Sequence, residues 1–119
     1  MKSFSVIFER GDVFIAPFPF TDMPLAKRRP VVVLSNAEPF NRETGQLVCA
    51  MITGARKSSW PFDSEIKDYK GAGLRGPCVV RMKLVTLDQR VIGARCGHLS
   101  KNDLARVTAN VLTITGAAA

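Results

Sequence analysis

Short apolar runs closed by Pro or Gly recur along most of the chain, and this pattern restricts it to a small β-rich fold. The run Val31-Val32-Val33-Leu34 is continuously apolar and β-branched, which is typical of a strand buried on both faces. Runs of this kind predict strands over residues 12–18, 31–34, 47–52, 62–66, 78–85 and 91–95. Polar connections with Pro and Gly separate them, so no long helix fits before residue 100.

The C-terminal segment has a different period and predicts one helix. Ser100 is a good N-cap residue, and Asp103 three positions later completes a capping-box pattern. Leu99 and Leu104 are spaced as a hydrophobic staple around that cap. A single apolar stripe follows at Leu104, Val107, Val111 and Ile114. Many short strands and one helix in 119 residues predict one mainly β domain over residues 1–119, built as a small barrel or strongly bent sheet.

The charge balance favours a polyanionic partner. Lys and Arg number 17 against 10 Asp and Glu, giving a net charge of +7 and a pI near 9.8. Nucleic acid suits such a domain better than a membrane surface. The basic residues form clusters at 27–29, at 56–57 and at 75–83. No apolar run has the roughly 20 residues of a membrane span, and the start lacks a signal-peptide pattern, so we expect a cytoplasmic protein.

The cysteines and the one histidine predict neither a disulfide framework nor a metal site. Cys49, Cys78 and Cys96 form an odd set without CxxC spacing, and His98 is not placed as a fourth zinc ligand. Cys49 lies inside an apolar run and is expected to be a small core residue. We therefore expect no metal and no cofactor.

The order of motifs along the chain resembles the MazF/PemK family of bacterial toxins of type II toxin–antitoxin systems. The opening RGDVFIAPFPFTD is followed by KRRPVVVLSN, and the similarity continues in register through Met51-Ile52-Thr53, Val79-Val80-Arg81 and Gly97-His98-Leu99-Ser100. It spans nearly the whole chain, and the ordered series of matches is more specific than any one of them. The resemblance implies an SH3-like barrel of about five to seven strands with a C-terminal α-helix, assembled as a homodimer.

The resemblance also implies an activity. Members of the family cleave single-stranded RNA, here expected to be messenger RNA at a short sequence, without a metal. The ribose 2′-hydroxyl attacks the adjacent phosphodiester and leaves a 2′,3′-cyclic phosphate and a 5′-hydroxyl end. A small acidic antitoxin inhibits the toxin, and the pair binds DNA. By resemblance, Arg29 and Thr53 occupy the family's catalytic positions, and Arg81 occupies that of an arginine used by the PemK-like branch.

The residue types fit this chemistry independently of the resemblance. Attack by a 2′-hydroxyl builds charge on phosphate oxygens, and donors aimed at those oxygens lower the barrier. A guanidinium is a permanently charged fork that matches phosphate geometry. The residues expected to bind RNA are basic, with one aromatic that serves either as a base-stacking platform or as a packing residue: Lys27, Arg28, Arg56, Lys57, Trp60, Arg75 and Lys83. We expect loops 21–29 and 54–60 to border the groove.

Two departures from the PemK-like pattern leave the proton-transfer group open. That branch has a carboxylate two residues after its arginine, where this chain has Lys83, and it has a histidine in the loop that spans 21–29 here. Acid–base candidates are then Asp22, Glu38 and Glu43, while His98 is expected to be a surface residue. Two other functions remain open at this stage. One is a non-catalytic CcdB-like poison of DNA gyrase, and the other is a non-catalytic nucleic-acid-binding barrel.

Overall fold

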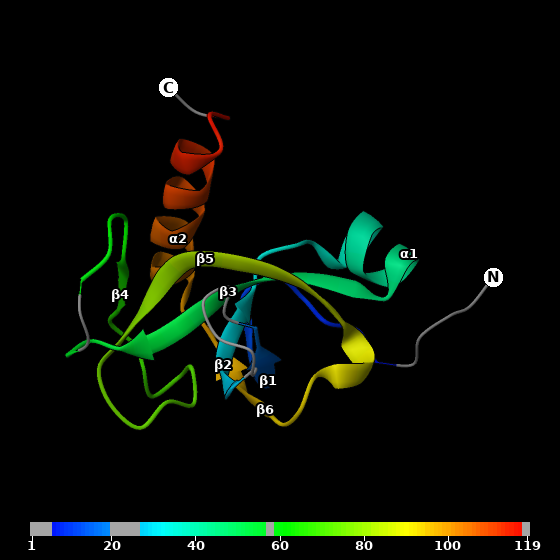
Figure 1. Cartoon of the computed structure of the whole chain (residues 1–119), viewed down its shortest axis with the longest axis horizontal. Helices are drawn as coiled ribbons and strands as arrows, with labels where there is room; N and C mark the ends of the chain where they lie inside the picture. Colours follow the sequence, from blue (N-terminus) through cyan, green and yellow to red (C-terminus); the bar gives the residue numbers. More distant parts are fainter. Residues whose placement is uncertain (1–5, 20–26, 57–58, 118–119) are drawn as a thin grey trace.

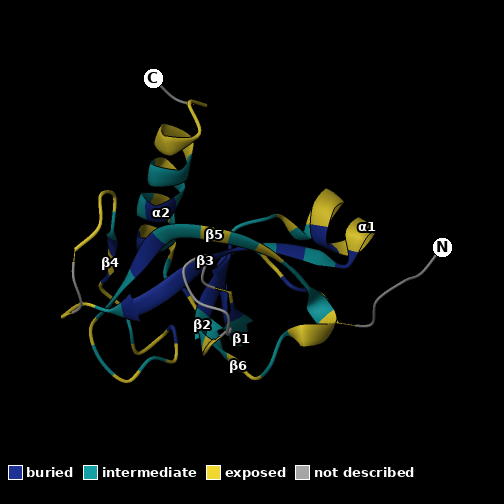
Figure 2. Ribbon diagram, in the orientation of Figure 1, coloured by how far each residue is buried: buried dark blue, intermediate teal, exposed yellow. Residues whose placement is uncertain are grey.

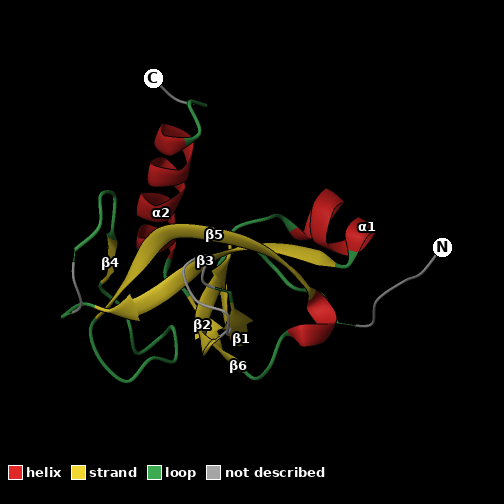
Figure 3. Cartoon of the chain, viewed as in Figure 1, coloured by secondary structure: helices red, strands yellow, loops and turns green. Residues whose placement is uncertain are grey.

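The computed structural model describes residues 6–19, 27–56 and 59–117. One curled sheet of six antiparallel strands in the order β4-β5-β3-β2-β1-β6 forms a half-barrel, with one longer helix at the C-terminus (Figure 1). This confirms the mainly β fold with a C-terminal helix. The strands are β1 (Asp12–Phe18), β2 (Lys27–Val33), β3 (Gln46–Gly54), β4 (Ser64–Ile66), β5 (Cys78–Asp88) and β6 (Arg95–His98). The helices are α1 (Arg42–Thr44) and α2 (Lys101–Ile114) (Figure 3).

Strand pairing extends two of the predicted strands. β1 has the predicted bounds, and its far end pairs Pro17 with Arg28 and Phe18 with Lys27, so β2 begins within the basic cluster that we expected in a loop. β3 runs through Thr53 and Gly54 because both pair with the start of β5. Both strands therefore extend beyond the apolar runs that predicted them.

The predicted strand over 91–95 is wrong. A helical turn occupies Gln89–Val91, and the Asp88 carboxylate caps it by accepting from the backbone N–H of Arg90 at 2.9 Å. The sixth strand is β6, which pairs His98 with Asp12 and Gly97 with Val13. The capped helical turn occupies the start of the predicted run, so the strand begins at Arg95, four residues later than predicted. The polar connection before β3 likewise contains helical structure, a turn over Ala37–Asn41 that leads into α1.

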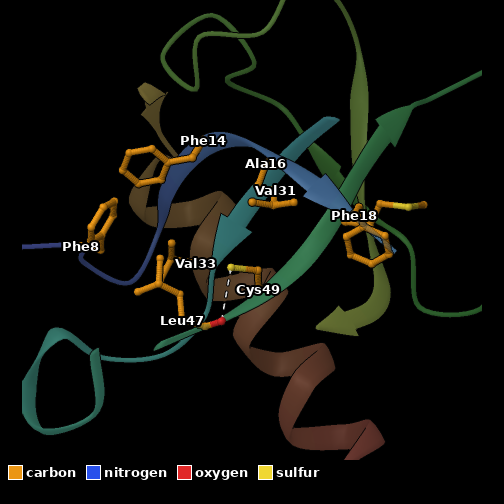
Figure 4. Close-up of a cluster of buried hydrophobic side chains, with 9 residues drawn as sticks. Phe8, Phe14, Ala16, Phe18, Val31, Val33, Leu47 and Cys49 are labelled. Atoms are coloured by element: carbon orange, nitrogen blue, oxygen red, sulfur yellow. Dashed lines mark hydrogen bonds between the residues drawn. The ribbon is translucent and has the colours of Figure 1, made fainter. Parts of the chain in front are cut away.

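Each face of the sheet has its own apolar core (Figure 2). On the face away from α2, one cluster contains Phe8, Phe14, Ala16, Phe18, Val31, Val33, Leu47, Cys49 and Met51 (Figure 4). Cys49 is fully buried there, and burial raises the pKa of its thiol to about 12, as expected for a core residue. The other face packs on α2 through residues such as Val32, Ile52 and Val107. Alternation along each strand separates the two sets.

Helix α2 starts where the sequence predicts. The Ser100 hydroxyl accepts from the Asp103 backbone N–H at 3.1 Å, and Leu99 and Leu104 both pack in or against the core beneath the helix. The Asp103 carboxylate binds a neighbouring segment, accepting from the backbone N–H groups of Lys67 at 3.1 Å and Asp68 at 2.9 Å. This buried carboxylate fixes the chain after β4 to the helix. In the described residues, no helix has the length and apolar character needed to cross a membrane.

Candidate functional site

Arg29, Thr53 and Arg81 lie on one face of the sheet, on three neighbouring strands. On β2, Arg29 is two residues from Val31, and Val31 pairs with Met51 of β3. On β3, Thr53 is two residues beyond Met51, and Met51 pairs with Arg81 of β5. Because side chains alternate along a strand, the register places all three side chains on the face that carries Met51. This is the face away from α2.

The three residues also lie near one end of the central strands. Pairing between β2 and β3 runs from Val33–Cys49 to Val31–Met51 and stops there. Arg29 and Thr53 occupy the next positions on that face, where the two strands separate. Thr53 faces Val79 across the β3–β5 ladder, so Arg81 is its diagonal neighbour, at a distance long side chains can span. Thr53 is buried and Arg29 is half-buried.

Arg81 is held by a carboxylate that the sequence did not single out. Its Nε donates to Asp63 Oδ1 at 3.1 Å, and its Nη2 donates to Asp63 Oδ2 at 2.9 Å. The Arg81 side chain is 7% exposed and that of Asp63 is 15% exposed. Arg81 is therefore a buried arginine in an ion pair and not part of an exposed basic surface. The two-point contact fixes the plane of the guanidinium.

Trp60 is a partly exposed aromatic beside this ion pair. The residue is 42% exposed, and the Lys83 ammonium lies 4.7 Å and the Arg81 guanidinium carbon 5.9 Å from its ring centroid. The Trp60 backbone N–H donates to Asp63 Oδ2 at 3.0 Å, so one carboxylate orders both the arginine and the turn that carries the tryptophan. Cations at this spacing are attracted to the ring.

The turn that presents Trp60 is itself constrained. Among the described residues, Phe62 is the one non-glycine with a positive φ, at 64°. Asn110 of α2 donates to the Phe62 carbonyl at 2.9 Å and holds the turn against the helix. The platform of Trp60 and Asp63 is therefore anchored at both ends, by β5 and by α2.

A largely apolar cavity of about 580 Å³ opens where β2 and β3 separate. Pro30 and Gly54 line it, and each directly follows one of the predicted catalytic residues. Strand alternation turns these two positions toward the α2 side of the sheet, opposite to Arg29 and Thr53. Arg56 and Arg75, both predicted to bind RNA, are exposed and also line the cavity.

The remaining predicted residues have separate places. Lys27 and Arg28 are exposed at the start of β2, and Lys57 lies outside the described residues, as does Asp22. Glu38 and Glu43 precede β3, about 25 Å along the nine-residue strand from Thr53. Glu38 pairs there with Arg42 at 2.5 Å.

The histidine and cysteine side chains form no catalytic or metal cluster in the part of the chain that the structure describes. His98 is exposed, with ring nitrogens near the carbonyls of Leu99 and Arg10. All three cysteines are free thiols. Within the described ranges, no group of three or more His, Cys, Asp and Glu side chains could hold a metal ion.

A curled antiparallel sheet, packed on one C-terminal helix and bearing arginines where its central strands separate, defines a small barrel suited to a polyanion. Residues 9–115 match the family model described as "PemK-like, MazF-like toxin of type II toxin-antitoxin system". The chain therefore belongs to this toxin family, as its motifs suggested. Among curated protein sequences, no relative matches the chain.

Solved structures agree with this fold at low sequence identity. A MazE–MazF complex from Deinococcus radiodurans is 23% identical, with a TM-score of 0.70 over 94% of this chain and 98% of the other. An endoribonuclease from a mycobacterial species is 18% identical, with a TM-score of 0.73 over 95% of each chain. A mycobacterial endoribonuclease in complex with its cognate antitoxin is 17% identical, with a TM-score of 0.70 over 92% and 94%.

Proposed function

We propose that this toxin is an endoribonuclease that cleaves single-stranded RNA without a metal. The proposed substrate is messenger RNA, cut at a short sequence. In this reaction the ribose 2′-hydroxyl attacks the neighbouring phosphorus, the bond to the 5′-oxygen breaks, and a 2′,3′-cyclic phosphate and a 5′-hydroxyl result. The observation that carries the proposal is the common face and common end of the sheet shared by Arg29, Thr53 and Arg81.

Each of the three side chains has a role that its chemistry supports. The guanidinium of Arg29 stabilises the charge that develops on the phosphate oxygens, and Thr53 adds a short-range hydroxyl donor from a buried position. Arg81 supplies a second guanidinium, already desolvated and fixed in plane. Preorganised donors of this kind need little reorganisation during the reaction, which makes them effective.

Asp63 acts through Arg81 as a positioning residue. Its carboxylate binds two nitrogen atoms of Arg81, so it restricts the rotation of the guanidinium and offsets the cost of burying that charge. The carboxylate lacking at position 83 is thereby replaced by one from the segment before β4. This supports a paired Arg–Asp site despite the departure in sequence.

The proposed partners follow from charge and family. A domain with a net charge of +7 suits RNA, and it equally suits an acidic antitoxin that covers the basic surface when the toxin must be silent. Complexes of antitoxin with related folds support this proposal. We further propose that the toxin acts as a homodimer and that it binds DNA only together with its antitoxin.

The test incubates the purified protein with single-stranded RNA in EDTA and maps the chemistry of the product ends. We expect 5′-hydroxyl ends, with cleavage reduced about 10²–10³-fold in Arg29→Ala and in Thr53→Ala. Matched controls are Arg42→Ala and Thr86→Ala, exposed residues away from the site that should leave the rate unchanged.

Three results would reject the proposal or part of it. RNA binding without cleavage would favour a non-catalytic nucleic-acid-binding barrel. Binding of DNA gyrase without affinity for RNA would favour a CcdB-like poison. Unchanged cleavage in both Arg29→Ala and Thr53→Ala would reject the site while leaving the activity.

A further inference from the structure

The cavity beside Pro30 and Gly54 is a separate concave site on the α2 side of the sheet, opposite to Arg29 and Thr53. Several of its wall residues, such as Leu74, also pack against the apolar cluster beneath α2, so the cavity extends that core to the surface. Its volume of about 580 Å³ lies in the range of roughly 300–1,000 Å³ usual for small-molecule sites. The cavity therefore has the size of a ligand site and faces away from the proposed chemistry.

Backbone contacts fix the walls of the cavity. The Ala55 N–H donates to the Pro77 carbonyl at 3.1 Å, which ties the end of β3 to the turn before β5. In the same turn Gly73 has a φ of 75°, and a Cβ there would collide with the carbonyl group of Cys96 on β6. Because the turn is joined to β3 and packs directly on β6, the fold itself sets the shape of the cavity.

The walls suit an aliphatic ligand better than a flat ring. Ile15, Leu74 and two prolines supply apolar surface, and among the described residues no aromatic and no acidic side chain lines the cavity. Nucleobases and similar rings are usually held by stacking on aromatic side chains, which these walls do not offer. An aliphatic chain gains affinity from burial alone, about fourfold for each methylene removed from water.

Two arginines at the opening of the cavity differ from the other arginines in their surroundings. Five arginines of the described chain form ion pairs with carboxylates, at positions 42, 81, 90, 95 and 106. Arg56 and Arg75 form no ion pair within the described ranges, and both are exposed where they line the cavity. A guanidinium is a planar fork that matches a carboxylate, so this pair complements a carboxylate attached to an apolar body.

We propose that this cavity binds an aliphatic carboxylate, the chemistry of a free fatty acid. The chain lies against Ile15 and Leu74, and the carboxylate accepts hydrogen bonds from Arg56 and Arg75 at the opening. These two arginines then serve a ligand on the α2 side of the sheet and not RNA on the other side. The site is independent of the proposed RNA cleavage, because no step of that reaction uses it.

The first experiment measures binding of decanoate, octanoate and hexanoate to the whole protein by calorimetry, below the concentrations at which these ligands form micelles. Each step along the series removes two methylenes and should weaken binding about 15-fold. Decyltrimethylammonium, which has the same chain and the opposite charge, should bind at least about tenfold more weakly than decanoate. Equal affinities for the three carboxylates, or for the two charge types, would overturn the proposal.

The second experiment places the ligand by thiol protection. Cys78 and Cys96 line the cavity as free thiols, and Cys49 is buried in the other core. Burial raises the pKa of the Cys78 and Cys96 thiols, so labelling with N-ethylmaleimide is carried out at alkaline pH and mapped by mass spectrometry. Decanoate at ten times its Kd should slow labelling of both about tenfold, with no change at a control cysteine introduced by Ala105→Cys on α2.

Two results of this experiment would reject the proposal. The first is bound decanoate that leaves both thiols fully reactive. The second is protection of both thiols by an uncleavable 2′-O-methyl RNA or by an acidic polyglutamate peptide, with none by decanoate. That result would assign the cavity to a macromolecule.

The third experiment separates the two parts of the site by substitution. Arg56→Gln and Arg75→Gln should each weaken decanoate about tenfold and leave decanol unchanged, with exposed Arg42→Gln as the matched control.

Filling the cavity tests its apolar part. A Cβ at Gly54 or at Gly76 would meet no atom within 4 Å, so Gly54→Leu and Gly76→Leu should fold. Both should weaken decanoate and decanol alike, and Ala105→Leu on exposed α2 should weaken neither. Unchanged decanoate affinity in both arginine variants, or in both leucine variants, would show that the ligand binds elsewhere.

Discussion

Arg81 and Asp63 form a two-point ion pair, with Nε–Oδ1 at 3.1 Å and Nη2–Oδ2 at 2.9 Å, beneath the ring of Trp60. The two residues come from β5 and from the turn before β4, eighteen positions apart. Both side chains are mostly removed from water, so each compensates the charge of the other. The pair links the fold of the β3–β4 connection to the geometry of the proposed catalytic face.

Replacement of Asp63 should therefore affect stability and activity together. We expect Asp63→Asn to lower the free energy of unfolding by about 3 kcal/mol, because it leaves a buried guanidinium without its counter-charge. Cleavage at temperatures where the variant is folded should also fall. Denaturant unfolding and initial rates measure the two effects, with exposed Glu65→Gln as the control.

A double-mutant cycle tests whether the effect of Asp63→Asn on stability arises from the ion pair with Arg81. In an Arg81→Met background, Asp63→Asn should cost far less stability than in the wild type. Equal costs in both backgrounds would show that Asp63 acts on the turn at Trp60 and not through Arg81.

Trp60 should bind RNA by stacking. We expect Trp60→Ala to weaken binding of uncleavable 2′-O-methyl RNA by about 1–3 kcal/mol, the usual contribution of one base stacked on an aromatic side chain. Trp60→Phe should retain most of the affinity. Phe40, another partly exposed aromatic, lies beyond the other end of β3 and serves as the control in Phe40→Ala. Full affinity in Trp60→Ala would assign the residue to packing against Lys83 and Arg81 alone.

Asp103 should make stability depend on acid pH. Burial raises its pKa, but hydrogen bonds from the Asp68 and Lys67 backbone and from Ser100, with the charge of Arg106, outweigh burial and lower it. A lowered pKa in the folded state means that the stabilisation is complete above the unfolded pKa of about 3.9 and is lost as the pH falls through the folded value.

The corresponding variant is Asp103→Asn. We expect it to lose about 2–3 kcal/mol of stability at neutral pH, because the carboxylate accepts from the two backbone N–H groups with separate oxygens and an amide offers only one acceptor oxygen. The difference from wild type should shrink below pH of about 4. Urea titrations across pH measure both effects, and exposed Glu43→Gln should follow the wild-type curve. If the difference in stability between the variant and the wild type did not depend on pH, the carboxylate charge would be excluded as its cause.

Phe62 should respond to glycine in the opposite direction from an ordinary phenylalanine. Its φ of 64° is a conformation that glycine adopts without steric cost, so Phe62→Gly should raise stability by up to about 1 kcal/mol. Phe40→Gly, at an exposed position in a helical turn, should lower stability by about 1 kcal/mol. A loss at both positions of similar size in thermal unfolding would show that contacts of the Phe62 ring outweigh its backbone strain.

Local patterns were sufficient for the regular elements. The bounds of β1 and the Ser100 cap of α2 follow from residues that contact each other within a few positions, and the apolar stripe of α2 needed only its period. The strand at 91–95 failed because the Asp88 cap and the helical turn occupy the start of the apolar run, and residues 93 and 94 make only isolated backbone hydrogen bonds with Ile15 before β6 begins. The ends of β2 and β3 were missed because cross-strand pairing extends a strand past its local signal.

The candidate site also contains residues that the sequence proposes and one that it does not. The order of motifs proposed Arg29, Thr53 and Arg81 as site residues, and strand alternation would place each on a face once the register was known. Asp63 was not identifiable, because a carboxylate in a turn has no sequence signal that connects it to an arginine on another strand. The sequence by itself determined the strands, the helix, the basic charge and the family resemblance, since these depend on composition and near neighbours. Only the tertiary structure decided the partner of Arg81, the burial of that arginine and the cavity at Gly54, because all three arise where distant strands pair and then separate.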